Sequence, residues 1–259
     1  MGEYEAIFKR RSVRKYQDEE IAFALLEEIK ELAKYPNKLF DIDFDIHVVE
    51  DGSKMQNVLK GLIGSYGKII APHYLVVTSE KREGYLENVG YALEDLVLKM
   101  TEMGLGTCYI GGFYDKNKVQ EVIEVKDGHE TVIVLAFGYP SKGIDYIKML
   151  VGAKRLGIDE FCDGDFDEQW KYVMDAVRVA PSAMNSQPWR FIKYNNIVDV
   201  YIKTNKKSQH IKDMNKIDIG IALQHLKVAA EYFKLSVDFK RLDKEDKDDL
   251  TYILSILEG

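Results

Sequence analysis

Apolar residues recur along this chain at two spacings, which predict where its helices and strands lie. A spacing of three or four residues, with charged side chains at the other positions, predicts helices over residues 25–33, 87–103, 170–180 and 219–232. Gly104 is placed to end the second of these helices. The third must stop before Pro181, because the residue that precedes a proline avoids the helical region.

Alternating or continuous apolar runs predict strands over residues 44–48, 72–78, 131–137, 198–204 and 252–257. The run 131–137 is almost entirely apolar, which is typical of a central strand covered on both faces. The Asp-Gly-Asp sequence at 163–165 predicts a loop.

The two halves of the chain share one short pattern. Residues 88–96 can be aligned with residues 218–226, and the aligned segments match at a Gly, an Ala and two Leu positions. The offset is 130 residues, half the chain, and each segment lies in a predicted helix. We therefore expect a duplicated structural unit.

Composition limits the class of protein. With 259 residues, 46% of them hydrophobic and 31% charged, the chain is long enough for one large domain or two small ones. A net charge of −7 argues against nucleic acid as a partner. Two cysteines, Cys108 and Cys162, indicate a reducing compartment. The first residues have no signal-peptide core and no apolar run is long enough to cross a membrane, so we expect a cytoplasmic protein.

The first candidate for chemistry is a basic segment, residues 10–16, with the sequence RRSVRKY. In an extended conformation Arg10, Ser12 and Arg14 would share one face. Two guanidinium groups with a hydroxyl between them suit a phosphate or another anion. The alternative is a solvated basic stretch near the end of the chain.

The second candidate is the sequence APSAMNSQPWRF at 180–191, in which small and amide residues follow a predicted helix stop. We call residues 180–188 the small-residue loop. Such a loop can bring backbone groups and an Asn side chain close to a flat polar ligand, or it can simply connect a helix to a strand.

A glycine-containing stretch, MGLGTCYIGGF at 103–113, is the third candidate. It is not a dinucleotide fingerprint, because the third glycine position holds Tyr109 and the stretch follows a helix. Its paired glycines would let the backbone approach the plane of a ligand, unless they form an ordinary turn. The five histidines lack metal-ligand spacing, so no metal site is expected, and Cys108 is interpreted as a packing residue rather than a nucleophile.

Taken together, these three stretches and Arg155 resemble the FMN-dependent nitroreductase family, over nearly the whole chain. The resemblance implies an α+β fold with a central, mostly antiparallel sheet flanked by helices. In that family the small-residue loop follows the basic segment closely and acts in the partner subunit of a homodimer. Here the second half of the chain carries it, so the sequence resembles the subfamily with two fused half-units, residues 1–157 and 158–259. This intra-chain pseudo-dimer implies a monomer.

The resemblance also implies roles toward FMN. Arg10, Arg11 and Ser12 would hold the phosphate and ribityl end, with Arg155 completing the anion site, and Arg14 would reach the N1–O2 edge of the ring. The backbone of Ile110, Gly111 and Gly112 would face the N5 edge. The remaining contacts would come from the small-residue loop of the second half: Pro181, Ser182, Ala183 and Asn185. The second half has acidic residues where the arginines should be, so one FMN per chain is expected.

The implied activity is transfer of electrons from NAD(P)H through bound FMN to a nitroaromatic, quinone or similar acceptor, with no obligatory catalytic side chain. Three alternatives stay open. The chain could hold FMN as a non-enzymatic carrier or sensor, it could use the same fold for other flavin chemistry such as reductive dehalogenation or flavin breakdown, or its arginines could bind another anion.

Overall fold

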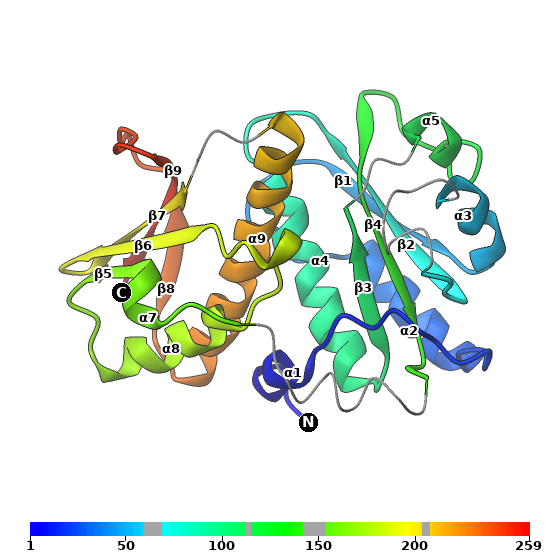
Figure 1. The fold of residues 1–259 in the computed structure, drawn as a ribbon, viewed down its shortest axis with the longest axis horizontal. Helices are drawn as coiled ribbons and strands as arrows, with labels where there is room; N and C mark the ends of the chain where they lie inside the picture. Colours follow the sequence, from blue (N-terminus) through cyan, green and yellow to red (C-terminus); the bar gives the residue numbers. More distant parts are fainter. Residues whose placement is uncertain (60–68, 112–114, 142–153, 204–207) are drawn as a thin grey trace. The chain divides into compact units, whose positions relative to one another are not determined.

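The computed structural model describes residues 1–59, 69–111, 115–141, 154–203 and 208–259 (Figure 1). The chain divides into two compact units. Unit 1 contains Lys9–Tyr85 and Asp95–Gly152 together with Met1, and unit 2 contains Gly2–Phe8, Leu86–Glu94 and Ala153–Gly259. Each unit has its own β-sheet and its own helices.

Unit 1 is built on a four-stranded antiparallel sheet in the order β1-β2-β4-β3. Its elements in chain order are α2 (Phe23–Lys34), β1 (Phe44–Val49), α3 (Gly52–Leu59), β2 (His73–Glu80), the second half of α4 (Tyr85–Glu102), β3 (Gly106–Ile110), α5 (Lys116–Val119) and β4 (His129–Gly138). As the apolar run 131–137 predicts, β4 is an inner strand, and its residues from Thr131 to Gly138 are buried.

Unit 2 contains a five-stranded sheet in the order β5-β6-β7-β9-β8, in which only the β5–β6 pair is parallel. Its elements are α1 (Glu3–Lys9), the start of α4, α7 (Ile158–Phe161), β5 (Cys162–Gly164), α8 (Glu168–Arg178), a 3₁₀ turn (Ala183–Asn185), β6 (Trp189–Tyr194), β7 (Ile197–Lys203), α9 (Gln209–Tyr232), β8 (Val237–Lys240) and β9 (Leu250–Glu258). The ring of Tyr4 in α1 stacks on that of Tyr232, with 4.2 Å between centroids.

The two sheets share one topology. Without β5, the order β6-β7-β9-β8 repeats the order β1-β2-β4-β3, and in both units a long helix, α4 or α9, leads from the second strand to the third. The aligned segments 88–96 and 218–226 fall on these two helices. This agreement supports the duplication that the sequence predicts.

The start of α4 packs against α9 within unit 2 at the two aligned glycines. A Cβ atom at Gly90 would stand 2.1 Å from the Ile217 carbonyl oxygen, and one at Gly220 would stand 2.0 Å from the Glu87 carbonyl oxygen. Only residues without a side chain allow the two backbones to approach so closely.

Most predicted elements are confirmed, with two differences. The helix predicted at 219–232 starts earlier, at Gln209. The expectation of a loop at 163–165 is wrong, because Cys162–Gly164 pair with β6 as an edge strand. That strand is held by backbone pairing, which leaves no apolar pattern in its sequence. Among the described residues, no helix combines the length and the apolar character needed to span a membrane.

Candidate functional site

The basic segment of unit 1 lies along the edge of β3. The Val13 N–H donates to the Thr107 carbonyl at 2.8 Å, and Ser12 forms a parallel bridge with Thr107. A Cβ atom at Gly106 would stand 2.5 Å from Val13 Cγ2, so glycine is needed for this close approach. Isolated bridges at Ser12 and Tyr16 join the segment to its neighbours.

Tyr16 ties the far end of the basic segment to β4. Its hydroxyl lies 2.7 Å from the Val13 carbonyl oxygen and 3.1 Å from that of Ala136. Burial raises the pKa of Tyr16, so the hydroxyl stays a proton donor at physiological pH. Just beyond β4, the Ser141 N–H donates to the Lys15 carbonyl at 3.0 Å. The segment is thus fixed to two strands of one sheet.

The side chains of the basic segment are not equally exposed. Arg10, which directly follows α1, is buried, whereas Arg11, Ser12 and Arg14 are exposed. The positive charges of Arg14 and Arg10 both act to lower the pKa of the Cys108 thiol in β3, although burial raises that pKa on balance. Both charges therefore lie near β3, and the buried Cys108 is a packing residue, as expected.

The predicted N5-edge residues begin on the same strand. Ile110 is buried at the end of β3, three residues after Thr107, and Gly111 is partly buried. Gly112 lies outside the described residues. One strand edge of unit 1 therefore carries both the anion-binding candidate and the start of the glycine-containing stretch.

In unit 2 the small-residue loop has a strained backbone. Met184, Asn185 and Gln187 have positive φ angles of 55°, 54° and 44°. Residues other than glycine adopt this conformation only when their surroundings enforce it, and such strain collects at functional sites. The side chain of Met184 is almost fully exposed.

Arg155 is one of the residues that enforce this conformation. Its Nη1 donates to the Ala180 carbonyl at 2.8 Å and to Asn185 Oδ1 at 3.0 Å, and its Nη2 donates to the Val179 carbonyl at 3.1 Å. The structure therefore brings Arg155 together with Asn185 and the loop. Its expected part in an anion site stays a prediction.

Two further side chains hold the loop: that of Asp218, which the sequence did not single out, and that of Gln187, which belongs to the loop itself. Both carboxylate oxygens of Asp218, in α9, accept the Ala183 N–H at 3.0 and 3.1 Å. Gln187 Oε1 accepts the Leu156 N–H at 2.9 Å, and the Gln187 N–H donates to Ser182 Oγ at 3.0 Å. The only sequence signal for Asp218 was its place in the segment repeated at 88–96.

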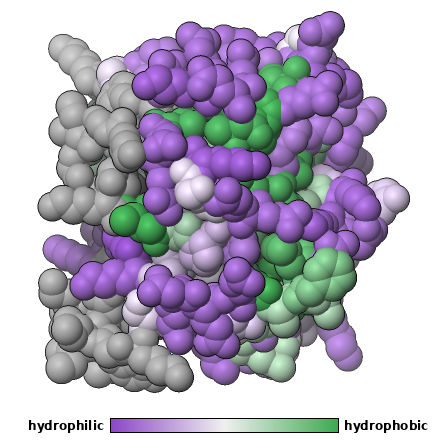
Figure 2. Space-filling view, turned by 90° about the vertical axis from the view of Figure 1, so that its right-hand side faces the viewer, coloured by the Kyte–Doolittle hydropathy of each residue, from purple (hydrophilic) through white to green (hydrophobic). Residues whose placement is uncertain are grey.

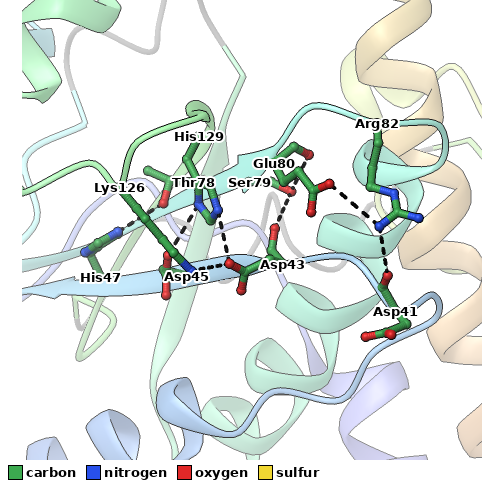
Figure 3. A network of polar contacts seen from close by, with 10 residues as sticks. All are labelled: Asp41, Asp43, Asp45, His47, Thr78, Ser79, Glu80, Arg82, Lys126 and His129. Atoms are coloured by element: carbon green, nitrogen blue, oxygen red, sulfur yellow. Dashed lines mark hydrogen bonds and ion pairs between the residues drawn. The ribbon is translucent and has the colours of Figure 1, made fainter.

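A separate polar network lies in unit 1 where β1, β2 and β4 pair (Figure 3). The two ring nitrogens of His129 lie 3.4 Å from carboxylate oxygens of Asp43 and Asp45, and Lys126 forms an ion pair with Asp43. His47 Nε2 lies 3.1 Å from Thr78 Oγ1. These contacts join side chains of β1, β2 and β4. No group of three metal-ligating side chains suited to an ion occurs among the described residues.

Comparison with known proteins decides the family. A family model described as "Putative TM nitroreductase" matches residues 3–230. The chain belongs to this nitroreductase family. A curated relative from Methanothermobacter thermautotrophicus, "Putative NADH dehydrogenase/NAD(P)H nitroreductase", is 27% identical over 153 residues, which cover 55% of this chain and 79% of the relative.

Solved structures show the nitroreductase fold. A nitroreductase structure from Thermotoga maritima aligns with 100% of this chain and 93% of its own, at 20% identity and a TM-score of 0.64. A structure from Parabacteroides distasonis with the same description as the curated relative aligns at 17% identity and a TM-score of 0.51, covering 63% of this chain and 98% of its own. The fold class implied by the sequence resemblance is confirmed, with one sheet in each unit.

Proposed function

We propose that this chain is an FMN-dependent oxidoreductase that passes electrons from NAD(P)H to a nitroaromatic, quinone or similar acceptor. The observation that carries the proposal is the placement of the basic segment along β3, the strand that ends at Ile110. Membership in the nitroreductase family supports the same chemistry.

The donor set of unit 1 fits the phosphate end of FMN. Arg11 and Arg14 supply exposed guanidinium groups and Ser12 an exposed hydroxyl, and Arg10 adds a charge at the base of the segment. Guanidinium groups donate paired hydrogen bonds to phosphate oxygens, and a preformed extended backbone lowers the entropy cost of binding.

The remaining contacts in the proposal divide between backbone and side chain. Arg14 would stand at the N1–O2 edge of the ring, and the backbone of residues 110–112 would face the N5 edge. In the small-residue loop, Pro181, Ser182, Ala183 and Asn185 would contact the ring. Arg155 would act by keeping that loop in its strained form, because its Nη atoms already donate to loop oxygens.

When bound, FMN supplies the electron and hydride chemistry. The residues named above bind and orient it. A guanidinium group at the N1–O2 edge would stabilise the negative charge that collects there on reduction. Since Arg14 is exposed in the described structure, its charge is available to a ligand.

The test is spectroscopic. The purified protein is mixed with FMN and desalted, its visible spectrum is recorded, and NADH or NADPH is added without oxygen. We expect one retained FMN per chain that bleaches with one of the two donors. An acceptor panel, with nitroaromatic, quinone and halogenated aromatic compounds, then separates nitroreductase from dehalogenase chemistry.

Other results would contradict the proposal. Retained flavin that neither donor bleaches would favour a carrier or sensor, and two FMN per chain would contradict the single site. No flavin binding in a titration would exclude a flavoprotein.

Arg14→Ala provides a matched comparison with Lys15→Ala, since both remove one exposed cation from the same segment. The proposal expects Arg14→Ala to weaken FMN binding about tenfold, because one charge-assisted contact to the ligand is lost, and to slow reduction by NAD(P)H. Lys15→Ala should change neither. Equal effects of the two substitutions would remove Arg14 from the site.

A further inference from the structure

Unit 1 contains a cavity of about 670 Å³ that the proposed flavin site does not use. It lies where the chain after the basic segment, the loop before α3 and the approach to β2 meet. Among its described lining residues are none of the proposed FMN contacts. A volume of this size is typical of a small-molecule site.

The charged side chains that line this cavity are acidic. Four carboxylates line it, from Asp18, Glu20, Glu50 and Asp51, and its described lining includes no Lys or Arg. Lys30 approaches Glu50, with 2.6 Å between Nζ and Oε1, and Asp51 accepts hydrogen bonds from Ser53.

The other two carboxylates, those of Asp18 and Glu20, are exposed and form no ion pair within the described part of the chain. Asp18 and Glu20 therefore add two negative charges to the described lining of the cavity. That charge disfavours phosphate-bearing ligands such as dinucleotides.

A buried histidine lines the cavity as well. His73 Nδ1 lies 2.7 Å from the Glu50 carbonyl oxygen, and its ring packs beside that of Phe137 with centroids 5.3 Å apart. Because a carbonyl oxygen only accepts, Nδ1 carries the hydrogen, and in the neutral ring Nε2 is an acceptor. Nε2 is buried and has no hydrogen-bond partner in the described structure. Buried acceptors in folded proteins almost always have a hydrogen-bond partner, so a ligand that donates a hydrogen bond would satisfy this atom.

Apolar side chains complete the lining. Phe23 and Ile70 are 77% and 64% exposed, which is unusual for such large apolar residues, and Ile21, Leu26 and Ala71 lie buried behind them. The side of unit 1 drawn in Figure 2 is mostly hydrophilic, with separate apolar areas that reach the surface. Exposed apolar side chains at a cavity offer contact area to a ligand's hydrocarbon part.

We propose that this cavity binds an organic cation, namely an ammonium group attached to an aryl or branched alkyl body. The ammonium group would donate to His73 Nε2 and be attracted by Asp18 and Glu20, and the body would pack against Phe23 and Ile70. An ammonium group supplies only donors, which matches a lining whose charged groups only accept. An aromatic ring such as that of Phe23 adds attraction for a cation. The site does not depend on the flavin chemistry.

The test is calorimetric titration of the full-length protein with three probes of similar shape: 2-phenylethylammonium, the neutral 2-phenylethanol and the anionic 3-phenylpropanoate. We expect one ammonium probe per chain, bound about tenfold more tightly than the alcohol, with no measurable binding of the carboxylate. Affinity should be the same with and without saturating FMN. Binding should also shift the ¹⁵N resonance of His73 Nε2.

The matched variants remove two charges each. Asp18→Asn with Glu20→Gln should weaken the ammonium probe about tenfold and leave the alcohol unchanged. Glu121→Gln with Glu124→Gln removes the same charge from exposed positions elsewhere in unit 1 and should change neither.

Any of four results would overturn the proposal. These are no ammonium binding up to about 10 mM, equal affinity for the three probes, equal effects of the two variant pairs, or loss of binding when FMN is added. The last result would mean that the probe occupies the flavin site.

Discussion

Met184, Asn185 and Gln187 have positive φ angles, a backbone conformation that residues other than glycine rarely adopt. Each such residue costs of the order of 1–3 kcal/mol, so the loop depends on outside contacts to remain in place. Arg155, Asp218 and Gln187 supply them, through hydrogen bonds that reach 24 to 35 residues along the chain. Strain of this kind collects at functional sites, which agrees with the part proposed for this loop.

Replacing Arg155 by lysine should destabilise unit 2 by about 1–3 kcal/mol, because a single ammonium group cannot serve the three oxygens that the guanidinium fork reaches. The matched control is Arg178→Lys, since Arg178 is partly exposed and pairs with Asp175 within one helical turn. That change should cost less than about 0.5 kcal/mol. Urea unfolding compares the two, and equal losses would contradict the restraining role.

His47 should titrate below its ordinary pKa of 6.5, because burial disfavours its charged form and His129 acts in the same direction, against Asp45. A depressed folded-state pKa means that the unfolded chain binds the proton more tightly. The contribution to stability is therefore present above pH 6.5 and is lost as the pH falls through the folded-state value. NMR titration of the ring gives this pKa directly. In His47→Gln the stability loss between pH 6.5 and 5 should be smaller, and an unchanged slope would contradict the assignment.

At the scale of elements, the crossing of α4 and α9 is set by Gly90 and Gly220. The strongest sequence pattern in the chain, the repeated segment, therefore marks a place where two backbones touch. Local patterns also predicted α4 and β4, because a long amphipathic stripe and an unbroken apolar run depend on few outside contacts. The four-residue β8 was not predicted, since its pairing with β9 rather than its own composition makes it a strand.

Gly90→Ala and Gly220→Ala should each destabilise the protein by about 3 kcal/mol or more, since the new methyl group meets a carbonyl oxygen inside van der Waals contact. Gly104→Ala is the comparison. Gly104 follows α4 with φ of +81°, and a Cβ atom there meets nothing within 4 Å, so only the backbone strain of about 1 kcal/mol is expected. Thermal or urea unfolding ranks the three variants, and a Gly104→Ala effect as large as the others would contradict the close crossing.

The candidate site shows the same division between local and distant information. The basic segment and the small-residue loop were evident from the sequence because unusual residues stand next to one another. Asp218 was not, because its partner in the loop is set by the fold. Packing also decides which arginines are exposed. Alternation along an extended segment predicted one shared face for Arg10, Ser12 and Arg14, yet Arg10 is buried and the other two are exposed.

At the scale of the whole molecule, the chain contributes to unit 2 in three pieces. Residues 2–8 form most of α1, whose Tyr4 stacks on Tyr232, and residues 86–94 carry Gly90 and the buried Glu94. Glu94 Oε1 lies 2.8 Å from His225 Nε2, and both side chains are fully buried. Dividing the chain after residue 152 would separate Tyr4, Gly90 and Glu94 from their partners in α9.

Residues 153–259 produced alone should therefore fail to fold cooperatively, because the α9 face that receives Gly90 and the buried His225 would lose their partners. Circular dichroism during urea unfolding should show a broad, non-cooperative change, in contrast to the full chain. A His225→Leu version of the fragment removes the unpaired buried group and tests packing alone. A sharp transition in the unmodified fragment would show that α1 and the start of α4 are dispensable.

The division of unit 2 into three separate pieces of the chain has a consequence during synthesis. Residues 2–8 and 86–94 leave the ribosome long before their partners in α9 and beyond are made. From residue 94 to Tyr232, the last residue of α9, translation at ordinary rates of about 5–20 residues per second takes roughly 7 to 28 seconds. During that interval the apolar start of α4 is without its cover, so the nascent chain is a natural client for chaperones that shield exposed helices.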